Sequence, residues 1–467
     1  MSKLGVNPYL PSWEYVPDGE PYVFGDRVYV YGSHDFFNGY VFCMGDYVCW
    51  SAPVSNLADW RYEGVIYPRN ADPLNTDGHS CLYAPDVTVG PDGRYYLYYV
   101  LDHEHVVSVA VCDEPAGRYQ FYGYVHYADG TLLGDGAGDE PQFDPGVLTE
   151  GDVTYMYTGF CGQGDKSRHG SMVTVLDRDM ITIREAPRFV VPGCEYAEGT
   201  EYAAHPFFEA SSIRKRGDTY YFVYSSTAMH ELCYATSKSP VGDFRFGGVL
   251  VSNCDIGVGD EPNLPKAYGG NNHGSIIEIN GRWYVFYHRQ TNASWYSRQG
   301  CIEPLDMRAD GSIPQAEMTS TGACGGLLPG KGEYPAYIAC HLYTSARTMM
   351  AAGPDSGMAP RVTQDGCDGD EEPGYIANIR DTTTIGFKYF DFGDATRITL
   401  KVRGYASGGT FHVRTSPNGE DLAALSTVNT NVWADYSAPI ALPRGKHALY
   451  IVYSGGGTAM LKSIVLE

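Results

Sequence analysis

A tyrosine-rich segment recurs five times in the first two-thirds of the chain and constrains the fold more than any other feature. The five segments are Arg27–Tyr31, Arg94–Tyr99, Val153–Tyr157, Thr219–Tyr224 and Arg282–Tyr287. Their last tyrosines follow one another at intervals of 68, 58, 67 and 63 residues. Aromatic and β-branched residues favour strands, and a turn signal of Gly or Asn with Asp or Gly precedes four of the five segments. Units of about 60 residues, with room for four short strands, are typical of propeller blades.

Five such units predict an all-β chain in which residues 1–315 form a five-bladed β-propeller. No long stretch combines a 3.6-residue apolar period with helix caps, so helices should be rare. The alternative is a sandwich or jelly roll in which the tyrosine runs recur by coincidence. Loops that carry function vary in length, so the uneven intervals are compatible with blades.

The tyrosine repeat stops after Pro314, and the rest of the chain has a different pattern. Residues 316–335 are rich in Gly, Pro and Thr and are predicted to form a linker. Residues 336–467 hold six strand-like segments with alternating apolar residues, at 375–379, 384–390, 397–403, 410–414, 447–453 and 459–466. This pattern predicts a second domain, an antiparallel β-sandwich of the jelly-roll type.

The charge balance excludes several classes of partner. With 33 Lys and Arg against 56 Asp and Glu, the formal net charge is −23, which argues against nucleic acid and anionic membrane surfaces. No run approaches the ~20 apolar residues of a membrane-spanning helix. The N-terminus has no apolar signal core, and the 12 cysteines form no C-x-x-C pair, so we expect a cytoplasmic protein with reduced thiols. A secreted chain that had lost its leader would have the same pattern, and a homo-oligomer is compatible with the sequence.

Every predicted blade offers one ionisable residue at nearly the same register. Counting 13 to 15 residues back from each marker tyrosine reaches the strand that should line the channel, at Asp18, Asp86, Asp144, Glu209 and His273. A single Asp beside Gly or Pro is commonly a turn cap, but five residues in register predict a shared site. Carboxylates that crowd together cannot all ionise freely, and groups with separated pKa values are what acid–base chemistry requires.

Two carboxylates that flank a bond are the arrangement of glycoside hydrolysis. One carboxylic acid protonates the leaving oxygen while the other carboxylate activates water or attacks directly; gaps of roughly 6.5–9.5 Å give inversion and roughly 5–5.5 Å give retention. Abundant aromatic side chains suit the apolar faces of sugar rings. The sequence therefore predicts a glycosidase site at the channel mouth.

The order and spacing of these motifs resemble glycoside hydrolase family 43 over residues 7–315. The motifs are Pro17-Asp18, Ala84-Pro85-Asp86, Phe143-Asp144-Pro145, the Glu209 strand and Asn272-His273-Gly274. The resemblance implies a five-bladed propeller and an inverting mechanism. It also implies Asp18 as the base, Glu209 as the general acid and Asp144 as the residue that orients the acid and tunes its pKa. The segments that follow Asp18 and Glu209 depart from the family pattern, which leaves the subfamily and substrate open.

The same resemblance implies further substrate contacts. Asp86 would lie at the channel edge. Arg298 would contact sugar hydroxyls, with Arg289 as its rival and a salt bridge to a channel carboxylate as the alternative for either. Four more residues lie in loops that could reach the channel mouth and are stacking or hydrogen-bonding candidates: Trp13, His34, Asp35 and Trp295.

His273 resembles a family histidine found beside a hydrated cation, and the alternative is a buried histidine bonded to backbone. We expect no required cofactor, although a calcium ion near His273 or in the C-terminal domain is compatible with the sequence. Calcium takes six to eight oxygen ligands, so one histidine cannot specify it.

The C-terminal third resembles a family 6 carbohydrate-binding module. Gly386–Phe390, the turns at Gly404 and Gly408-Gly409, and Trp433 carry the resemblance. It implies sugar binding on exposed aromatic rings, for which Tyr375 and Trp433 are the candidates. The alternative is a structural domain that supports the propeller and binds nothing.

The favoured hypothesis is an inverting glycosidase that releases arabinofuranosyl or xylosyl units from plant-type oligosaccharides. An endo-arabinanase of the same fold is one alternative, and an open groove in place of a pocket would distinguish it. A sugar-binding propeller without catalysis is the other, and it would require Asp18, Asp144 or Glu209 to be out of place.

Overall fold

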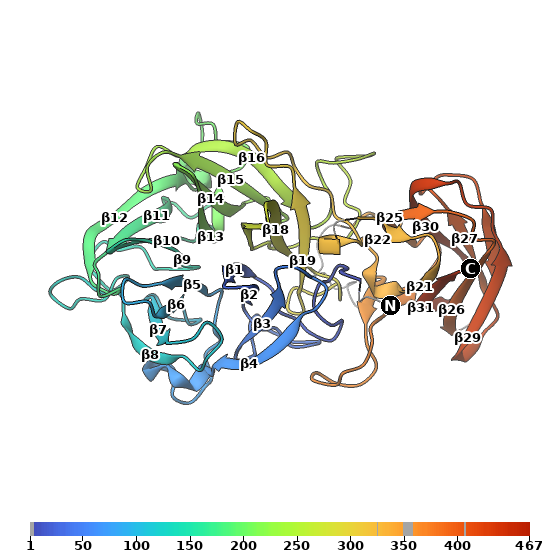
Figure 1. Cartoon of the computed structure of the whole chain (residues 1–467), viewed down its shortest axis with the longest axis horizontal. Helices are drawn as coiled ribbons and strands as arrows, with labels where there is room; N and C mark the ends of the chain where they lie inside the picture. The colour runs from blue at the N-terminus through green and yellow to red at the C-terminus, as the bar shows by residue number, and fades with distance from the viewer. Residues whose placement is uncertain (1–3, 325, 349–357, 406–407) are drawn as a thin grey trace.

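The computed structural model describes residues 4–324, 326–348, 358–405 and 408–467. Five small sheets surround a common centre, and a two-sheet sandwich follows at the C-terminal end (Figure 1). The predicted all-β fold, a five-bladed propeller followed by a β-sandwich, is confirmed. No helix in the described ranges exceeds one short 3-10 turn, and none there could cross a membrane.

The first four blades each have four antiparallel strands in sequence order. Blade one contains β1 (Glu20–Phe24), β2 (Arg27–Tyr31), β3 (Tyr47–Pro53) and β4 (Arg61–Tyr67). Blade two contains β5 (Asp86–Val89), β6 (Tyr95–Tyr99), β7 (Ser108–Cys112) and β8 (Gln120–Tyr124). Blade three contains β9 (Gly146–Glu150), β10 (Val153–Thr158), β11 (Gly170–Leu176) and β12 (Ile183–Pro192). Blade four contains β13 (Phe207–Arg216), β14 (Thr219–Ser226), β15 (Glu231–Ser237) and β16 (Arg245–Ser252).

Blade five differs from the prediction of four strands. Its described strands are β17 (Ser275–Ile279), β18 (Arg282–Arg289) and β19 (Gln299–Leu305). The N-terminal segment runs along the free edge of β19: the Tyr9 N–H donates to the Gly300 carbonyl at 3.2 Å, and the Asn7 side chain exchanges two hydrogen bonds of 2.9 Å with the backbone of Ile302. The two ends of the propeller are thereby held together.

The tyrosine repeat has a structural cause. Each tyrosine-rich segment is the second strand of its blade, and all five marker tyrosines are buried. Their rings fill the space within and between blades while their hydroxyl groups find acceptors, as buried tyrosines require. Tyr31 donates to the Pro115 carbonyl of blade two at 2.7 Å, and Tyr157 donates to the Pro240 carbonyl of blade four. The same packing position therefore selects the same residue in each blade.

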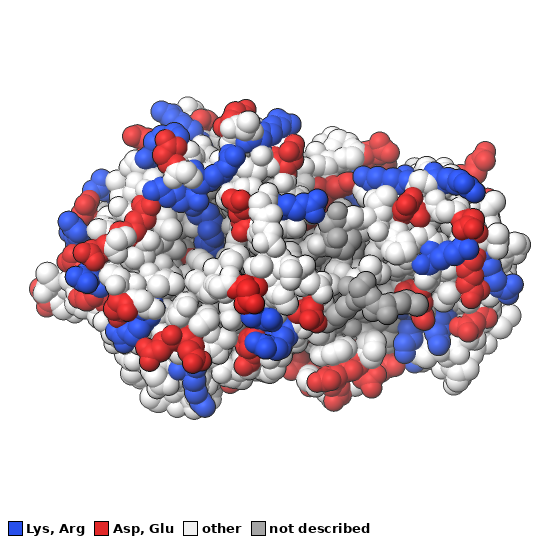
Figure 2. Space-filling model, in the orientation of Figure 1, with Lys and Arg blue, Asp and Glu red and all other residues white. Residues whose placement is uncertain are grey.

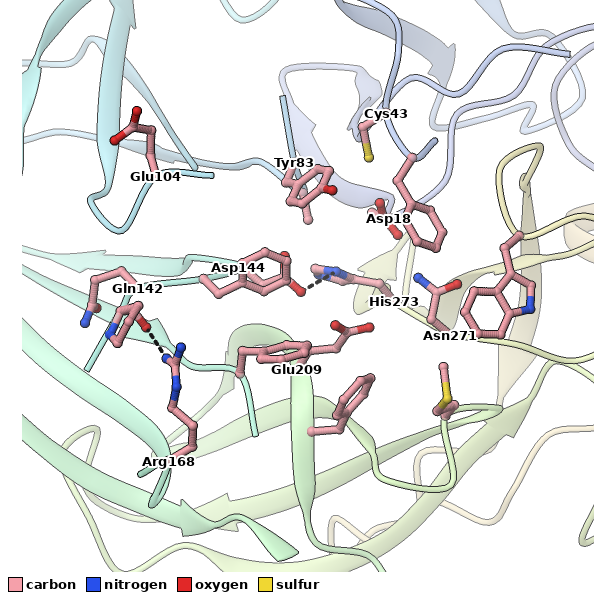
Figure 3. A pocket seen from close by; sticks show the side chains of 18 of the residues that line it. Asp18, Cys43, Tyr83, Glu104, Gln142, Asp144, Arg168, Glu209, Asn271 and His273 are labelled. Atoms are coloured by element: carbon pink, nitrogen blue, oxygen red, sulfur yellow. Dashed lines mark hydrogen bonds and ion pairs between the residues drawn. The ribbon is translucent and has the colours of Figure 1, made fainter. Parts of the chain in front are cut away.

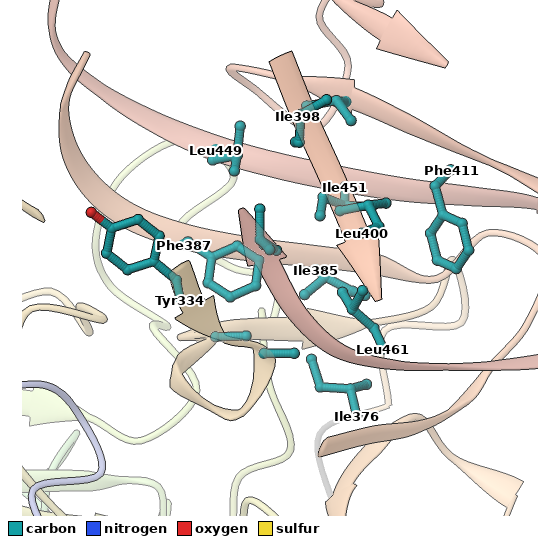
Figure 4. Packing of buried hydrophobic residues seen from close by; sticks show 14 of the residues in the cluster. Tyr334, Ile376, Ile385, Phe387, Ile398, Leu400, Phe411, Leu449, Ile451 and Leu461 are labelled. Carbon is teal, nitrogen blue, oxygen red and sulfur yellow. The ribbon is translucent and has the colours of Figure 1, made fainter. Parts of the chain in front are cut away.

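The sandwich consists of two sheets in which strands that are distant in the sequence lie side by side. One sheet has the order β20 (Leu328–Pro329), β25 (Thr384–Phe392), β30 (Gly445–Gly455), β27 (Gly409–Arg414) and β28 (Ala423–Ser426), with β22 (His341–Tyr343) beside β25. The other has the order β23 (Arg361–Thr363), β24 (Tyr375–Ile379), β31 (Thr458–Leu466), β26 (Arg397–Tyr405) and β29 (Thr430–Pro439), with β21 (Gly332–Pro335) beside β31. Apolar residues from both sheets, such as Phe387, Leu400 and Ile451, interdigitate to form its core (Figure 4).

Part of the predicted linker belongs to the sandwich domain. Residues 316–335 include β20 and β21, and Leu328 and Tyr334 are buried in the sandwich core. Short Gly- and Pro-rich strands carry too little alternation to be recognised from sequence. The remaining elements are the single 3-10 turns η1 (Arg69–Ala71), η2 (Pro73–Asn75), η3 (Cys194–Tyr196), η4 (Gly322–Cys324) and η5 (Ala336–Ile338).

Buried charges join the sandwich to blade four. Asp255, which follows β16, contacts His341 Nε2 at 2.7 Å and Lys388 Nζ at 2.8 Å through its Oδ2 atom. On the surface, acidic and basic side chains are interspersed over the face shown in Figure 2, so the net charge of −23 is not gathered at one place on that face.

Candidate active site

A cavity of about 420 Å³ opens where the inner strands of the blades converge. Four of the five ionisable residues predicted from the repeat line it, namely Asp18, Asp144, Glu209 and His273. The side chains of Asp18, Asp144 and Glu209 point toward the same space, with His273 between them (Figure 3). Arg298, another predicted residue, also lines this cavity.

The backbone before each inner strand aims these groups. Asp18 and Asp144 stand two residues before β1 and β9, with φ values of 58° and 45°. Asp is among the few non-glycine residues that adopt this left-handed conformation readily. The turn directs each carboxylate toward the channel mouth before the regular strand begins.

Glu209 reaches the cavity through an irregularity in β13. The pairing of β13 with β14 shifts register on both sides of Glu209, and Ala210 has a φ of 69°. Bulges of this kind re-aim side chains next to active sites. The Ala210 N–H also donates a 3.0 Å hydrogen bond to Asp144 Oδ2. One bulge therefore directs Glu209 and anchors Asp144.

Asp18 is held in its ionised form. Burial alone would raise its pKa, but the Arg298 guanidinium, with Nη1 2.9 Å from Oδ1, and the His288 ring, with Nδ1 3.2 Å from Oδ1, outweigh that effect. Together they hold the pKa of the Asp18 carboxyl well below its usual range. A carboxylate in this state can accept a proton.

In contrast to Asp18, Glu209 and Asp144 have raised pKa values. Burial, followed by the charge of Asp18, raises the pKa of Glu209 to about 8. Burial and then the neighbouring Glu209 raise the pKa of Asp144 well above its usual value. The cavity thus combines a carboxylate that stays ionised with a carboxylic acid that stays protonated at neutral pH.

His273 lies beneath these groups, with its Nδ1 atom 3.5 Å from Asp144 Oδ2. Burial lowers the pKa of His273 to about 4, so its ring is neutral at pH 7. Calcium takes six to eight oxygen ligands. Within the described ranges, no third His, Cys, Asp or Glu donor joins this pair, and the calcium ion considered from the sequence stays a prediction. Nor do the described residues of the sandwich gather a group of three such donors.

Aromatic rings form the walls of the cavity. Phe42 and Trp295 lie nearly parallel with centroids 6.4 Å apart, and the Arg298 guanidinium lies 4.9 Å from the Phe42 ring centre. Phe160 packs between Phe143 and Phe208 at 5.3 and 5.1 Å. Such surfaces suit the apolar faces of sugar rings.

Other lining residues escaped the sequence analysis. Gln142 and Asn271 stand two positions before Asp144 and His273, so the strand-entry motifs already pointed to them. Arg168 and Glu104 come from loops without a recurring pattern, and nothing in the sequence distinguishes them. Arg168 donates to the Pro141 carbonyl at 3.0 Å and lies at the end of the cavity away from Asp18 (Figure 3).

Asp86 and Arg289 do not line the cavity, contrary to the prediction. Asp86 is the first residue of β5 and is buried beneath it, accepting hydrogen bonds from the Tyr22 hydroxyl at 2.6 Å and the Val147 N–H at 2.7 Å. It ties blade two to its neighbours. Arg289 extends toward the sandwich: its Nε donates to Cys301 Sγ of β19 at 2.9 Å, and its Nη1 donates to the Ala339 carbonyl of the sandwich at 3.4 Å.

Two loop candidates also lie outside the cavity lining. Trp13 is half-buried, and His34 is held by Glu14 Oε1 at 2.9 Å and the Asp46 carbonyl at 3.1 Å. Asp35 does not line the cavity but supports it, because its carboxylate receives Nε and Nη2 of Arg298 at 2.8 and 3.0 Å. Of the four loop candidates, Trp295 alone lines the cavity.

The aromatic pair predicted for sugar binding in the sandwich is engaged internally. Tyr375 is 6% exposed, and its hydroxyl bonds to Asp365 at 2.9 Å, so it offers no free ring face. Arg403 and Lys462 lie 4.5 and 5.6 Å from the ring centre of Trp433, whose ring also packs against Tyr375. These cations compete with a sugar for the Trp433 faces.

A propeller cavity that pairs an ionised carboxylate with a protonated carboxylic acid defines a glycoside hydrolase. Comparison with protein families agrees, because residues 16–313 match the family model described as glycosyl hydrolases family 43. The chain therefore belongs to glycoside hydrolase family 43, as its motifs predicted, and it is an inverting glycosidase.

Relatives extend the likeness over the whole chain. The chain is 61% identical over 471 aligned residues to a xylosidase/arabinosidase of Thermoclostridium stercorarium, covering 100% of this chain and 99% of that protein. It is 25% identical to an arabinoxylan arabinofuranohydrolase of Paenibacillus polymyxa over 99% of this chain and 72% of that one. Among solved structures, a family 43 enzyme of Xanthomonas citri complexed with xylose matches 69% of this chain and 95% of its own, with a TM-score of 0.55 and 27% identity.

Proposed function

We propose that this protein removes terminal xylosyl or arabinofuranosyl units from short oligosaccharides. The observation that carries the assignment of roles is the opposed protonation of Asp18 and Glu209 in one cavity. The pentose preference is supported by the 61% identical relative, a xylosidase/arabinosidase, and by the matching Xanthomonas citri enzyme that holds xylose. A cavity of about 420 Å³ is in the size range of small-ligand sites, which favours a chain end over the middle of a polymer.

The chemistry follows from the two carboxyl groups. The Glu209 carboxylic acid gives its proton to the glycosidic oxygen as the bond from that oxygen to the anomeric carbon breaks. The Asp18 carboxylate takes a proton from a water molecule whose oxygen bonds to the same carbon from the opposite face. The sugar leaves with inverted configuration. Asp18 is then protonated and Glu209 ionised, and proton exchange with solvent restores both.

Three further residues prepare these groups. Arg298 and His288 keep Asp18 ionised, so the base is ready before substrate binds. Asp144 is fixed by the Ala210 N–H directly beyond Glu209, so it is placed to govern the orientation and pKa of the acid. Because repulsion between two carboxylates is mutual, Asp144 and Glu209 titrate as a coupled pair that resists the ionisation of both members.

Hydrolysis of a panel of nitrophenyl pentosides and hexosides, with wild type beside Glu209→Ala, tests the proposal. We expect release of nitrophenol from a xyloside or arabinofuranoside and a smaller loss in the variant on these activated substrates than on unactivated disaccharides. Activity confined to hexosides would overturn the pentose assignment. If no substrate of the panel is hydrolysed but internal bonds of arabinan are cleaved, the protein is an endo-acting enzyme and chain-end hydrolysis is overturned.

A further inference from the structure

A second cluster of reactive side chains lies in blade four, outside the cavity lining. His205 Nδ1 is 2.6 Å from Glu231 Oε1, and Cys233 Sγ is 3.6 Å from the same oxygen. The three donor atoms all lie within 4.8 Å of one another. Among the residues that the structure describes, it is the one group of three His, Cys, Asp or Glu donors gathered in this way.

The fold builds this cluster from two separate elements. Glu231 and Cys233 are two positions apart on β15, so their side chains emerge on the same face of the strand. His205 arrives from the loop that precedes β13. Its ring stacks on Phe246 at 4.9 Å, and its carbonyl accepts a 2.8 Å hydrogen bond from the Tyr224 hydroxyl. The histidine is thus held over the strand by contacts that do not depend on the cluster.

The burial of the three side chains and their access to solvent both suit a bound cation. Cys233 is 0% exposed and Glu231 is 6% exposed, while the His205 side chain is 29% exposed and provides a route from solvent. Ser226 Oγ donates at 2.5 Å to Glu231 Oε1, the oxygen that also contacts His205 and Cys233, and helps to fix the carboxylate. Hydrogen-bonded outer partners of this kind accompany metal-ligating carboxylates.

We propose that His205 Nδ1, the Glu231 carboxylate and Cys233 Sγ bind one divalent cation of the zinc type. Imidazole, thiolate and carboxylate are ligands that Zn²⁺ accepts at four-coordinate sites, with a water molecule able to take the fourth position. Mg²⁺ and Ca²⁺ prefer oxygen ligands alone, so the thiol argues against them. On binding, the Cys233 thiol gives its proton to solvent, and the proton on His205 Nδ1, which faces Glu231, leaves to solvent or moves to Nε2, so that the sulfur and Nδ1 both bond to the metal.

The location gives this cation a structural role. His205 stands four residues before Glu209, and Glu231 begins the strand after the hairpin whose Met229 lines the cavity. A cation held by both would tie the entry of β13 to the start of β15. It would brace the segment that carries the proposed acid without contacting the substrate.

Cobalt absorption provides a direct test, because thiolate ligation of Co²⁺ produces a charge-transfer band. Cys367 is exposed and could bind metal adventitiously, so all proteins carry Cys367→Ser. We expect Co²⁺ alone to produce the band at one equivalent per chain, and Zn²⁺ to displace it. Zn²⁺ should also raise the melting temperature by at least about 2 °C.

Two variants and a matched control make the result specific. Cys233→Ser should abolish the band, and His205→Gln should weaken Co²⁺ binding at least tenfold. Cys194→Ser, which removes another partly accessible thiol, should change neither. The His205 variant keeps the test decisive if Cys233→Ser fails to fold, because its side chain is partly exposed. No band in the parent protein, a band that survives in Cys233→Ser, or equal binding in His205→Gln would overturn the proposal.

Discussion

The Nη1 atom of Arg298 lies 2.9 Å from Oδ1 of Asp18, and both side chains are almost fully buried. The same guanidinium binds Asp35 through Nε at 2.8 Å, so its orientation is fixed independently of Asp18. A planar guanidinium donates from several nitrogens in a rigid fork, so it holds both carboxylates at fixed angles. Asp18 is therefore kept ionised and pointed at the cavity by a rigid partner.

Asp18→Asn should abolish hydrolysis of activated and unactivated substrates alike. The amide cannot accept a proton from water, and loss of a general base costs on the order of 10²–10⁴ in rate. The measurement is kcat/KM on a nitrophenyl pentoside and a disaccharide, with the melting temperature as a check on folding. Asp26→Asn, an exposed substitution in the same blade, should leave both values unchanged. Turnover near the wild-type rate in Asp18→Asn would remove it as the base.

Glu209→Ala should separate substrates by their leaving groups. A disaccharide needs its leaving oxygen protonated, whereas a nitrophenolate leaves without a proton. We expect a loss of about 10²–10⁴ in kcat/KM for the disaccharide and a smaller loss for the aryl glycoside. The exposed Glu198→Gln on the preceding loop serves as the matched control. Equal losses on both substrates would contradict the acid role.

The pH profile should be broad on its acidic side and limited near pH 8. The proposed base must be ionised, and the pKa of Asp18 lies well below its usual range, so acidification should reduce kcat/KM little until low pH. The proposed acid must be protonated, and burial raises the pKa of Glu209 to about 8, so kcat/KM should fall as the pH rises through that value.

Asp144→Asn should move the alkaline limb of this profile toward neutral pH. Repulsion makes the wild-type pair give up its two protons in separate steps, and the variant has only the Glu209 proton, which it loses without that repulsion. The measurement is kcat/KM between pH 5 and 10 for both proteins. Because interacting carboxyls titrate as a pair, the limb reports the pair in the wild type and Glu209 alone in the variant. An unmoved limb with a lower rate would indicate that Asp144 only orients its neighbours.

The sequence could predict those parts of the molecule that repeat. Each blade needs the same tyrosine at the same packing position, and the chain enters each inner strand at a similar distance from it, so Asp18, Asp144 and Glu209 were found by counting. Asp86 shares that count but lies on β5 itself, where backbone N–H groups of Val87 and Val147 bind its carboxylate. A shift of one residue reverses where a strand side chain points, and a count that varies by one or two residues between blades cannot resolve it.

The positions of residues in irregular loops could not be predicted either, because they depend on contacts between segments that are distant in the sequence. Arg289 and Arg298 stand on either side of one loop in blade five, and only the packed structure shows that one meets the sandwich and the other meets Asp18. Trp433 was a reasonable candidate for sugar binding, but Arg403 approaches it from a neighbouring strand. Contacts between distant segments determine both outcomes.

Arg168→Met should distinguish the two ends of the cavity. Arg168 lies away from Asp18, and its guanidinium is anchored on the Pro141 carbonyl at 3.0 Å, so it is placed to donate to the leaving part of a longer substrate. We expect KM for a trisaccharide to rise about tenfold, the effect of one lost hydrogen bond to a charged group. The values for a nitrophenyl pentoside, which lacks that part, should stay within about twofold. The exposed Arg178→Met at another position in blade three is the control, and equal losses on both substrates would place Arg168 in general support of the cavity.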